Sequence, residues 1–218
     1  MQQTIFTTLS INDLWFMMEG AAKTLWLTFW GALLGTCLGA VLGWIKTLDN
    51  WLLTSPVNMV TDVLRSVPLL IQFVLWSSGL GILGFNLDVF HISVIALSLY
   101  MAAYVSEVVR GGILAVPTVT RKAARSLGMT YWQDLRYVVL PIGTGIVLPA
   151  WIGLVLGLMK DTSLVAVIGY IELLRASQII INRTQEPILV LLGAGIFYFA
   201  LGYPISKLSG RIKTQGAY

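Results

Sequence analysis

The sequence predicts an all-α membrane protein with five transmembrane helices, and three observations lead to this fold class. Of its 218 residues, 57% are hydrophobic and only 11% are charged. The mean hydropathy is +0.82. An average soluble domain carries roughly 25% charged residues, so this chain has too few polar groups to cover a soluble enzyme. Five uncharged stretches are also long enough to cross a bilayer core of about 30 Å.

The uncharged stretches give the order of the predicted spans. They are Thr24–Ile45, Ser66–Leu87, Val89–Ser106, Tyr137–Met159 and Pro187–Ser206. A further apolar stretch, Thr162–Ile171, is too short to cross, and it predicts a re-entrant or interfacial segment.

The distribution of charge predicts the topology. Asp13 and Glu19 precede the first basic residue, Lys23, which does not match a secretory signal peptide. Ten of the 14 Lys and Arg residues lie in or near the 1–2 loop, the 3–4 loop and the C-terminal segment. Because Lys and Arg accumulate on the cytoplasmic side, we expect the N-terminus outside and the C-terminus inside. We therefore expect an extracytoplasmic lead-in over 1–20, a transmembrane domain over 21–208 and a cytoplasmic tail over 209–218.

Several classes of site are excluded by composition. A single cysteine, Cys37, and a single histidine, His91, permit neither an internal disulfide nor a Cys/His zinc cluster. The chain has no G-x-x-x-x-G-K-S/T loop for phosphate, so we expect no cofactor, no metal and no catalytic residue in it. Its net charge of +4 follows from the basic loops and does not call for a nucleic-acid partner.

Small residues recur every four positions in two of the spans. The rows are Gly31, Gly35, Gly39 and Gly43 in the first span, and Gly145, Pro149, Gly153 and Gly157 in the fourth. Such rows lie on one helix face and predict close helix packing. Pro141 and Pro149 predict kinks in the fourth span, which suit either a position beside a pathway or a purely structural bend.

The loop between the third and fourth spans predicts a short amphipathic helix. Gly111, Gly112 and Pro117 interrupt the exit from the third span. We expect Thr118 or Thr120 to cap a new helix, and Gly128 to end it in a left-handed conformation. Ala124, Leu127 and Tyr131 share one face, whereas Arg121, Lys122 and Arg125 point elsewhere. The helix rests on lipid headgroups or docks a cytoplasmic partner.

The same loop resembles the EAA loop of ABC transporter permeases. The matching run is Lys122-Ala123-Ala124-Arg125-Ser126-Leu127-Gly128, followed by Leu140-Pro141. Wider matches to the polar amino-acid branch are Leu64–Gln72, Ala102–Ile113, Ala124–Gln133, Val138–Pro141 and Lys160–Gln178. They follow the family's order over roughly residues 60 to 180. Lys122 replaces the family's acidic residue, and our hypothesis is that this chain forms half of a heteromeric pair whose other subunit has the standard loop.

The resemblance implies the ABC importer permease fold and a function. The chain would be a non-enzymatic transmembrane subunit of an ATP-driven importer for polar or charged amino acids, of the histidine, glutamate, glutamine or arginine type. It would lie in a bacterial cell (inner) membrane as a multi-pass protein. Its implied partners are ABC-type ATPase subunits that bind ATP and Mg, a second identical or related permease chain and an extracytoplasmic solute-binding protein. The coupling loop covers about 117–135, and the implied ATPase-coupling residues are Arg121, Lys122, Ala123, Ala124, Arg125, Leu127 and Gly128.

Polar residues at membrane depth are the candidates for the substrate pathway, because such groups are costly there. They are Arg65, Gln72, Lys160, Asp161, Thr162 and Ser163. Asp161 could hold the α-amino group of an amino acid, or Lys160 and Asp161 could both lie at the outer surface. We expect Arg65 to reach the interface or to pair with Asp62.

The remaining charged residues of the third span are expected at its ends. Glu107 and Arg110 have the spacing of a helix-end ion pair, and His91 is expected near the outer interface. A stand-alone channel or an ion-coupled carrier of small polar solutes remains the alternative function. Five helices without an evident inverted repeat argue against many carriers. An intramembrane enzyme is disfavoured because no cluster of catalytic side chains is present.

Overall fold

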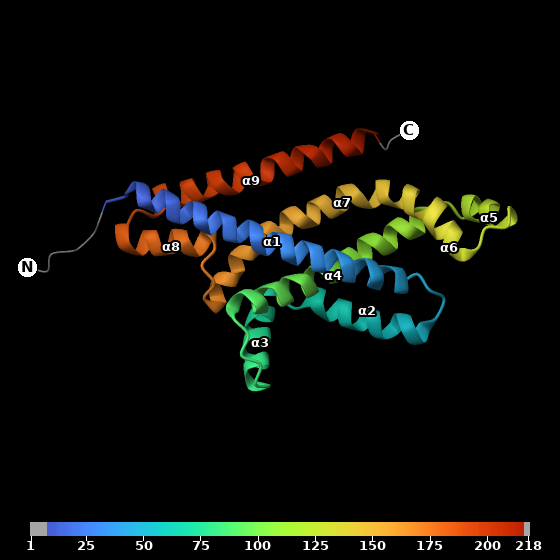
Figure 1. Ribbon diagram of the computed structural model, residues 1–218, viewed down its shortest axis with the longest axis horizontal. Coiled ribbons are helices and arrows are strands. Elements are labelled where there is room, and N and C mark those ends of the chain that lie inside the picture. The colour runs from blue at the N-terminus through green and yellow to red at the C-terminus, as the bar shows by residue number, and fades with distance from the viewer. Residues whose placement is uncertain (1–7, 216–218) are drawn as a thin grey trace, which may run out of the picture.

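The computed structural model describes residues 8–215, with side chains up to residue 207. Within that part of the chain the structure is helical and has no strand. The elements are α1 (Ile11–Ile45), α2 (Trp51–Ser66), α3 (Leu69–Ile82), α4 (Val89–Ala115), α5 (Thr118–Ser126), α6 (Tyr131–Asp134), the π-helical turn η1 (Leu135–Val139), α7 (Leu140–Asp161), the 3-10 helix η2 (Thr162–Ile168), α8 (Leu173–Thr184) and α9 (Pro187–Gln215). Figure 1 shows an elongated bundle with α5 and α6 at one end and α8 at the other.

The predicted all-α membrane fold is confirmed. Four segments of the described chain are long and apolar enough to cross a membrane: α1, α4, α9 and the run Tyr131–Ile168, which contains α7. The bent pair of α2 and α3 makes a fifth when it is counted as one span. Residues 11–20, predicted as part of the lead-in, form the first turns of α1, whereas residues 1–7 lie outside the described residues. The placement of the termini on either side of a membrane stays a prediction.

The second span is not the single helix that the sequence predicted. It breaks at Val67 and Pro68, and the axes of α2 and α3 differ by 109°. Pro68 forces the residue before it into an extended conformation, and Val67 has φ −82° and ψ 127°. Figure 1 shows α3 leaving the bundle steeply as a result.

The glycine row of α1 packs closely against another helix, as predicted, and the structure shows that this helix is α4. A Cβ atom on Gly35 would lie 2.6 Å from the Cβ atom of Met101, so only glycine permits this approach of the two helices. The row in α7 was predicted to pack in the same way, and this is wrong within the chain. A Cβ atom added to Gly145, Gly153 or Gly157 would have no neighbouring atom within 4 Å. Those glycines leave open space beside α7.

The core lies where α1, α3, α4 and α7 meet. Leu27, Phe73, Leu97 and Leu158 contribute fully buried side chains to it, one from each of these helices. A second apolar cluster joins the beginning of α1 to α8 and α9. At this end Asp13 of α1 also forms an ion pair with Arg183 of α8. The two clusters fix the long helices along the same axis.

The stretch predicted as re-entrant or interfacial continues α7 as η2. It ends at Gly169, whose φ of 92° lies in the left-handed region. η2 packs against α3 and α8 as well as against α7. Its depth in a membrane stays a prediction.

Candidate functional site

The predicted loop helix is present as α5, a helix of nine residues. Gly128 adopts the predicted left-handed conformation with φ 86°. The predicted threonine cap is wrong. Pro117 occupies the N-cap position and Thr118 is already helical, so neither threonine hydroxyl is placed to accept the first free N–H groups.

Most of α5 faces away from the rest of the chain. Ala124 is its only buried residue. Lys122 and Ala123 are exposed, and so are Val119 at 76% and Leu127 at 83%. Leu127, which the sequence placed on one face with Ala124, is the C-cap residue of α5 and is exposed, whereas Ala124 is buried. The exposed set is a compact, partly apolar surface at one end of the bundle.

Two of the predicted coupling residues point back to their own loop. The guanidinium groups of Arg121 and Arg125 lie 3.0 and 3.8 Å from the carboxylate of Asp134 on α6. Asp134 is 1% exposed, and its second oxygen has no hydrogen-bond partner among the described residues. The arginines therefore hold α5 on α6, and Lys122 is the outward-facing cation of this helix.

The loop is also tied to α1 through aromatic side chains that sequence reasoning missed. The indole N–H of Trp44 donates a hydrogen bond to the Tyr131 hydroxyl at 3.0 Å. The rings of Trp44 and Trp132 lie 5.7 Å apart. Thr130 and Gln133 form a capping box at the start of α6. The Thr-x-x-Gln spacing was the available signal for this cap.

Asp161 lies near the opposite end of α7, beside a small pocket between α4 and α7. Tyr100 and Tyr104 of α4 line the pocket together with Gly153 and Gly157 of α7, and its volume is about 140 Å³. Asp161 is half-buried, Lys160 is exposed and Ser163 is half-buried. The Thr162 hydroxyl donates to the Met159 carbonyl and is not free for a ligand. Of the four consecutive candidates, Asp161 alone lines this pocket.

Arg65 belongs to an ion-pair network that joins α1, α2 and α4. Arg65 pairs with Asp62 at 2.6 Å, as predicted. Glu107 was expected to pair with Arg110, and this is wrong. Lys46, whose side chain is 0% exposed, pairs with Glu107 at 2.6 Å and donates to Thr61 at 2.7 Å. The network closes the end of the bundle near the coupling loop.

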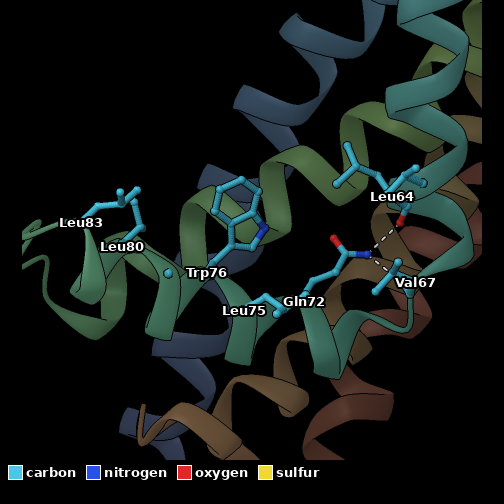
Figure 2. Close-up of a pocket in the computed structure, with 9 residues that line it drawn as sticks. Leu64, Val67, Gln72, Leu75, Trp76, Leu80 and Leu83 are labelled. Carbon is cyan, nitrogen blue, oxygen red and sulfur yellow. Dashed lines mark hydrogen bonds between the residues drawn. The ribbon is translucent and has the colours of Figure 1, made fainter.

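Gln72 lies at the break between α2 and α3 and is 3% exposed. Its amide nitrogen donates to the carbonyl oxygens of Leu64 at 2.7 Å and Val67 at 2.8 Å. Figure 2 shows both bonds, with the amide oxygen pointing away from them. Gln72 lines a cavity between α2 and α3 that does not include Arg65 or Asp161. The predicted pathway residues therefore do not line one common site: Gln72, Asp161 and Arg65 lie in three different parts of the structure.

One buried acidic residue was missed. Glu172, the N-cap of α8, is 0% exposed and accepts hydrogen bonds from the backbone N–H groups of Leu174 and Arg175. The hydroxyl groups of Thr24 and Tyr198 donate to the same carboxylate. Burial raises the pKa of Glu172, and these hydrogen bonds oppose that shift. A lone acidic residue beside an apolar stretch was the signal that could have found it.

The described residues contain no group of three or more His, Cys, Asp or Glu side chains that could hold a metal ion. His91 lies in the first turn of α4 and its ring is hydrogen-bonded to Asp88. The main candidate features are thus the α5 surface, the Asp161 pocket and the Gln72 cavity.

Residues 35–211 match the family of binding-protein-dependent transport system inner membrane components. The chain belongs to this family. It is therefore a multi-pass membrane component of a transport system. The matched residues include the coupling loop and the residues that line the two cavities described above.

Named relatives of this permease handle amino acids. It is 28% identical over 201 residues to the glutamine transport system permease protein GlnP of Escherichia coli (strain K12). The aligned region covers 91% of this chain and 92% of the relative. It is 33% identical over 193 residues to the arginine transport system permease protein ArtQ of Bacillus subtilis (strain 168), with 88% of each chain covered. The similarity thus extends over nearly the whole length of each permease.

Solved structures share the fold. An amino acid ABC transporter crystallised with histidines has a TM-score of 0.85 and 30% identity, with 96% of this chain and 100% of that chain covered. The inward-facing MetNI methionine ABC transporter has a TM-score of 0.79 at 21% identity, and this match supports the fold alone. The predicted ABC importer permease fold is confirmed.

Proposed function

We propose that this permease forms the translocation pathway of an ATP-driven importer for polar or charged amino acids in a bacterial inner membrane. The relatives named for glutamine and arginine support this substrate class. The permease would work with ABC-type ATPase subunits that bind ATP and Mg, a second permease chain and an extracytoplasmic binding protein. The chemistry of ATP hydrolysis would reside in the ATPase and not in this chain.

One arrangement carries the proposal: along the chain, α5 lies between the two helices that border the Asp161 pocket. α4 contributes Tyr100 and Tyr104 and ends just before α5, whereas α7 contributes Asp161 and begins after α6 and η1. Helices transmit displacement along their axes, and α7, at 22 residues, is about 33 Å long. A partner that moves α5 would therefore change the distance between the two walls of the pocket.

The Asp161 pocket suits the amino group of an amino acid. A carboxylate is a strong partner for an ammonium group, and the tyrosine hydroxyls can donate or accept. Gly153 and Gly157 leave room on the α7 wall between Leu154, Leu158 and Asp161. We propose that the Asp161 carboxylate binds the α-amino group, and that Lys160 and Ser163 lie near the entrance of this pocket. The Thr162 hydroxyl instead bonds the Met159 carbonyl at the end of α7.

The test uses the permease reconstituted in vesicles with its ATPase and binding protein. Asp161→Asn should lower ATP-driven amino-acid uptake and substrate-stimulated ATP hydrolysis, while basal hydrolysis is retained. Glu186→Gln, at an exposed position, is the matched control and should leave all three unchanged. Normal uptake in Asp161→Asn would refute the role of Asp161. Isolation of the permease without any ATPase, from a preparation that preserves other complexes, would favour a stand-alone channel or carrier.

A further inference from the structure

A groove lies between the first turns of α1 and α9, at the end of the bundle opposite the coupling loop. Its volume is about 410 Å³, and it shares no residue with the two cavities described above. Met17 of α1 and Val190 of α9 are buried and form its floor, whereas Leu14 and Leu189 are about half exposed and form its walls. We call it the α1–α9 groove. Figure 1 shows where these two helices begin, with α8 beside them.

The groove opens toward lipid, because both helices that form it are long and apolar enough to cross a membrane. Trp15, which follows the wall residue Leu14 on α1, is 64% exposed. Tryptophan side chains accumulate where the hydrocarbon core meets the headgroups, so this turn of α1 lies at the membrane surface. Gly193 lines the groove one helical turn further along α9 than Leu189. The groove therefore runs from the headgroup level toward the hydrocarbon core.

The headgroup end of the groove carries a fixed charge pair. Asp13 lines this end, and its side chain is 9% exposed. One of its carboxylate oxygens pairs with Arg183 of α8, and the other accepts hydrogen bonds from the backbone N–H and the hydroxyl of Ser10. The Arg183 side chain is 44% exposed, and its other N–H groups have no acceptor among the described residues. Arg183 is thus held in place and still has donors to offer.

A guanidinium group with free donors at the headgroup end of an apolar groove matches the chemistry of a phospholipid. Arg binds phosphate oxygens through charge-assisted hydrogen bonds, and an acyl chain fits the apolar walls. The acyl chain gains little by leaving the equally apolar bilayer, so the phosphate contact supplies the preference over bulk lipid. A water-soluble solute does not suit these walls, and an apolar protein segment would leave Arg183 without an anion.

We propose that the α1–α9 groove binds a phospholipid from the membrane leaflet opposite the coupling loop. One acyl chain lies along Leu14, Met17 and Val190 and reaches Gly193, and the phosphate group accepts hydrogen bonds from Arg183. The bound lipid contacts α1, α8 and α9 together, so it stabilises this end of the folded permease. The assignment does not depend on which solute is transported.

Two glycines of α9 provide a matched pair of variants. Gly193 lines the groove, and a Cβ atom there would lie 3.5 Å from Cε of Met17. Gly195 does not line the groove, and a Cβ atom there would have no neighbour within 4 Å. Gly193→Leu fills the inner end of the groove, and Gly195→Leu makes the same change in the same helix outside it. Arg183→Gln removes the charge and leaves the groove open.

The measurement is photolabelling of the permease purified in detergent with its partner subunits. The probe is phosphatidylglycerol with a diazirine group in one acyl chain, and mass spectrometry locates the labelled residues. Labelling of the first turns of α1 and α9 should saturate. Unlabelled phosphatidylglycerol should compete about fivefold or more better than diacylglycerol, which has no phosphate. Gly193→Leu and Arg183→Gln should each weaken the labelling about fivefold or more, and Gly195→Leu should leave it unchanged.

Several results would overturn the assignment. Labelling that does not saturate would show contact with bulk lipid only, and equal competition by diacylglycerol would rule out the phosphate contact. Unchanged labelling in Gly193→Leu, or an equal loss in Gly195→Leu, would place the lipid outside the groove. Labelling of the isolated permease but not of the permease with its partners would show that a protein covers the groove. If Arg183→Gln fails to fold for want of its ion pair, Gly193→Leu, which keeps that pair, decides the outcome.

Discussion

Arg121 donates two hydrogen bonds to the same carboxylate oxygen of Asp134, from Nε at 3.1 Å and from Nη2 at 3.0 Å. The two residues belong to α5 and α6, so this pair fixes the outward-facing helix to the start of the run that leads into α7. Charge-assisted bonds of this kind are stronger than neutral ones, and the carboxylate is shielded from solvent. A helix that transmits force needs such an attachment.

Asp134→Asn should weaken coupling more than it weakens folding. An amide removes the negative charge that balances Arg121 and Arg125, and we expect a loss of about 1–3 kcal/mol in the attachment of α5. Substrate-stimulated ATP hydrolysis by the reconstituted complex should fall, and the thermal unfolding midpoint of the permease should change little. Asp49→Asn, at an exposed position of the α1–α2 loop, is the control. Full stimulation in Asp134→Asn would show that the pair is not needed.

Lys46→Met should destabilise the permease by about 3 kcal/mol, because it leaves Glu107 without its buried partner. Glu107 would retain an ion pair with Arg65 at 3.7 Å and the more distant charge of Arg110. Glu107→Gln should cost less, since an amide oxygen still accepts from Lys46 Nζ. Unfolding in denaturant, followed in detergent, measures both variants. Their double mutant gives the coupling energy, and a value near zero would contradict a direct interaction.

The sequence was sufficient for features that depend on composition and local pattern. The glycine row ending in Gly43 predicted close helix packing, because spacing alone places these residues on one face, and the structure shows that the partner is α4. Gly128 predicted the end of α5 for a similar reason. The break at Pro68 was missed, because the length of an uncharged stretch does not record the direction of the backbone within it.

Long-range pairs account for the other errors at the candidate site. Glu107 has Arg110 within one helical turn, and local spacing therefore favoured that pair. Its actual partner, Lys46, is 61 positions away in the sequence. Asp134 could not be assigned to Arg121 before the turn at Gly128 was placed. These contacts depend on how the helices pack, which sequence spacing does not specify.

The buried carboxyl group of Glu172 should make stability depend on pH. Burial raises its pKa in the folded state above the ordinary value of 4.5. The folded protein then binds this proton more tightly than the unfolded chain, so the contribution of Glu172 to stability is most favourable below pH 4.5 and is lost as pH rises through the raised pKa.

Glu172→Gln tests this pH dependence. The unfolding midpoint is recorded for the variant and for wild type from pH 4 upwards. As pH rises, the midpoint of the variant should increase relative to that of wild type. Glu186→Gln removes an exposed carboxylate after the other end of α8 and should show no such trend. A midpoint difference that stays constant with pH would mean that Glu172 does not titrate in this range.

Lys122 is the residue of α5 that most directly tests partner choice. It is exposed on a surface shared with Val119 and Ala123, whereas Arg121 and Arg125 face Asp134. Close charge pairs govern partner selection more than total affinity, so reversing this charge should change which permease or ATPase chains bind. Lys122→Glu should therefore alter the set of copurified subunits and lower coupled uptake, whereas Lys122→Arg should preserve both. Quantitative mass spectrometry of tagged complexes from native membranes measures the composition. An unchanged composition with unchanged uptake in Lys122→Glu would refute the hypothesis that this chain is one half of a heteromeric pair selected by charge.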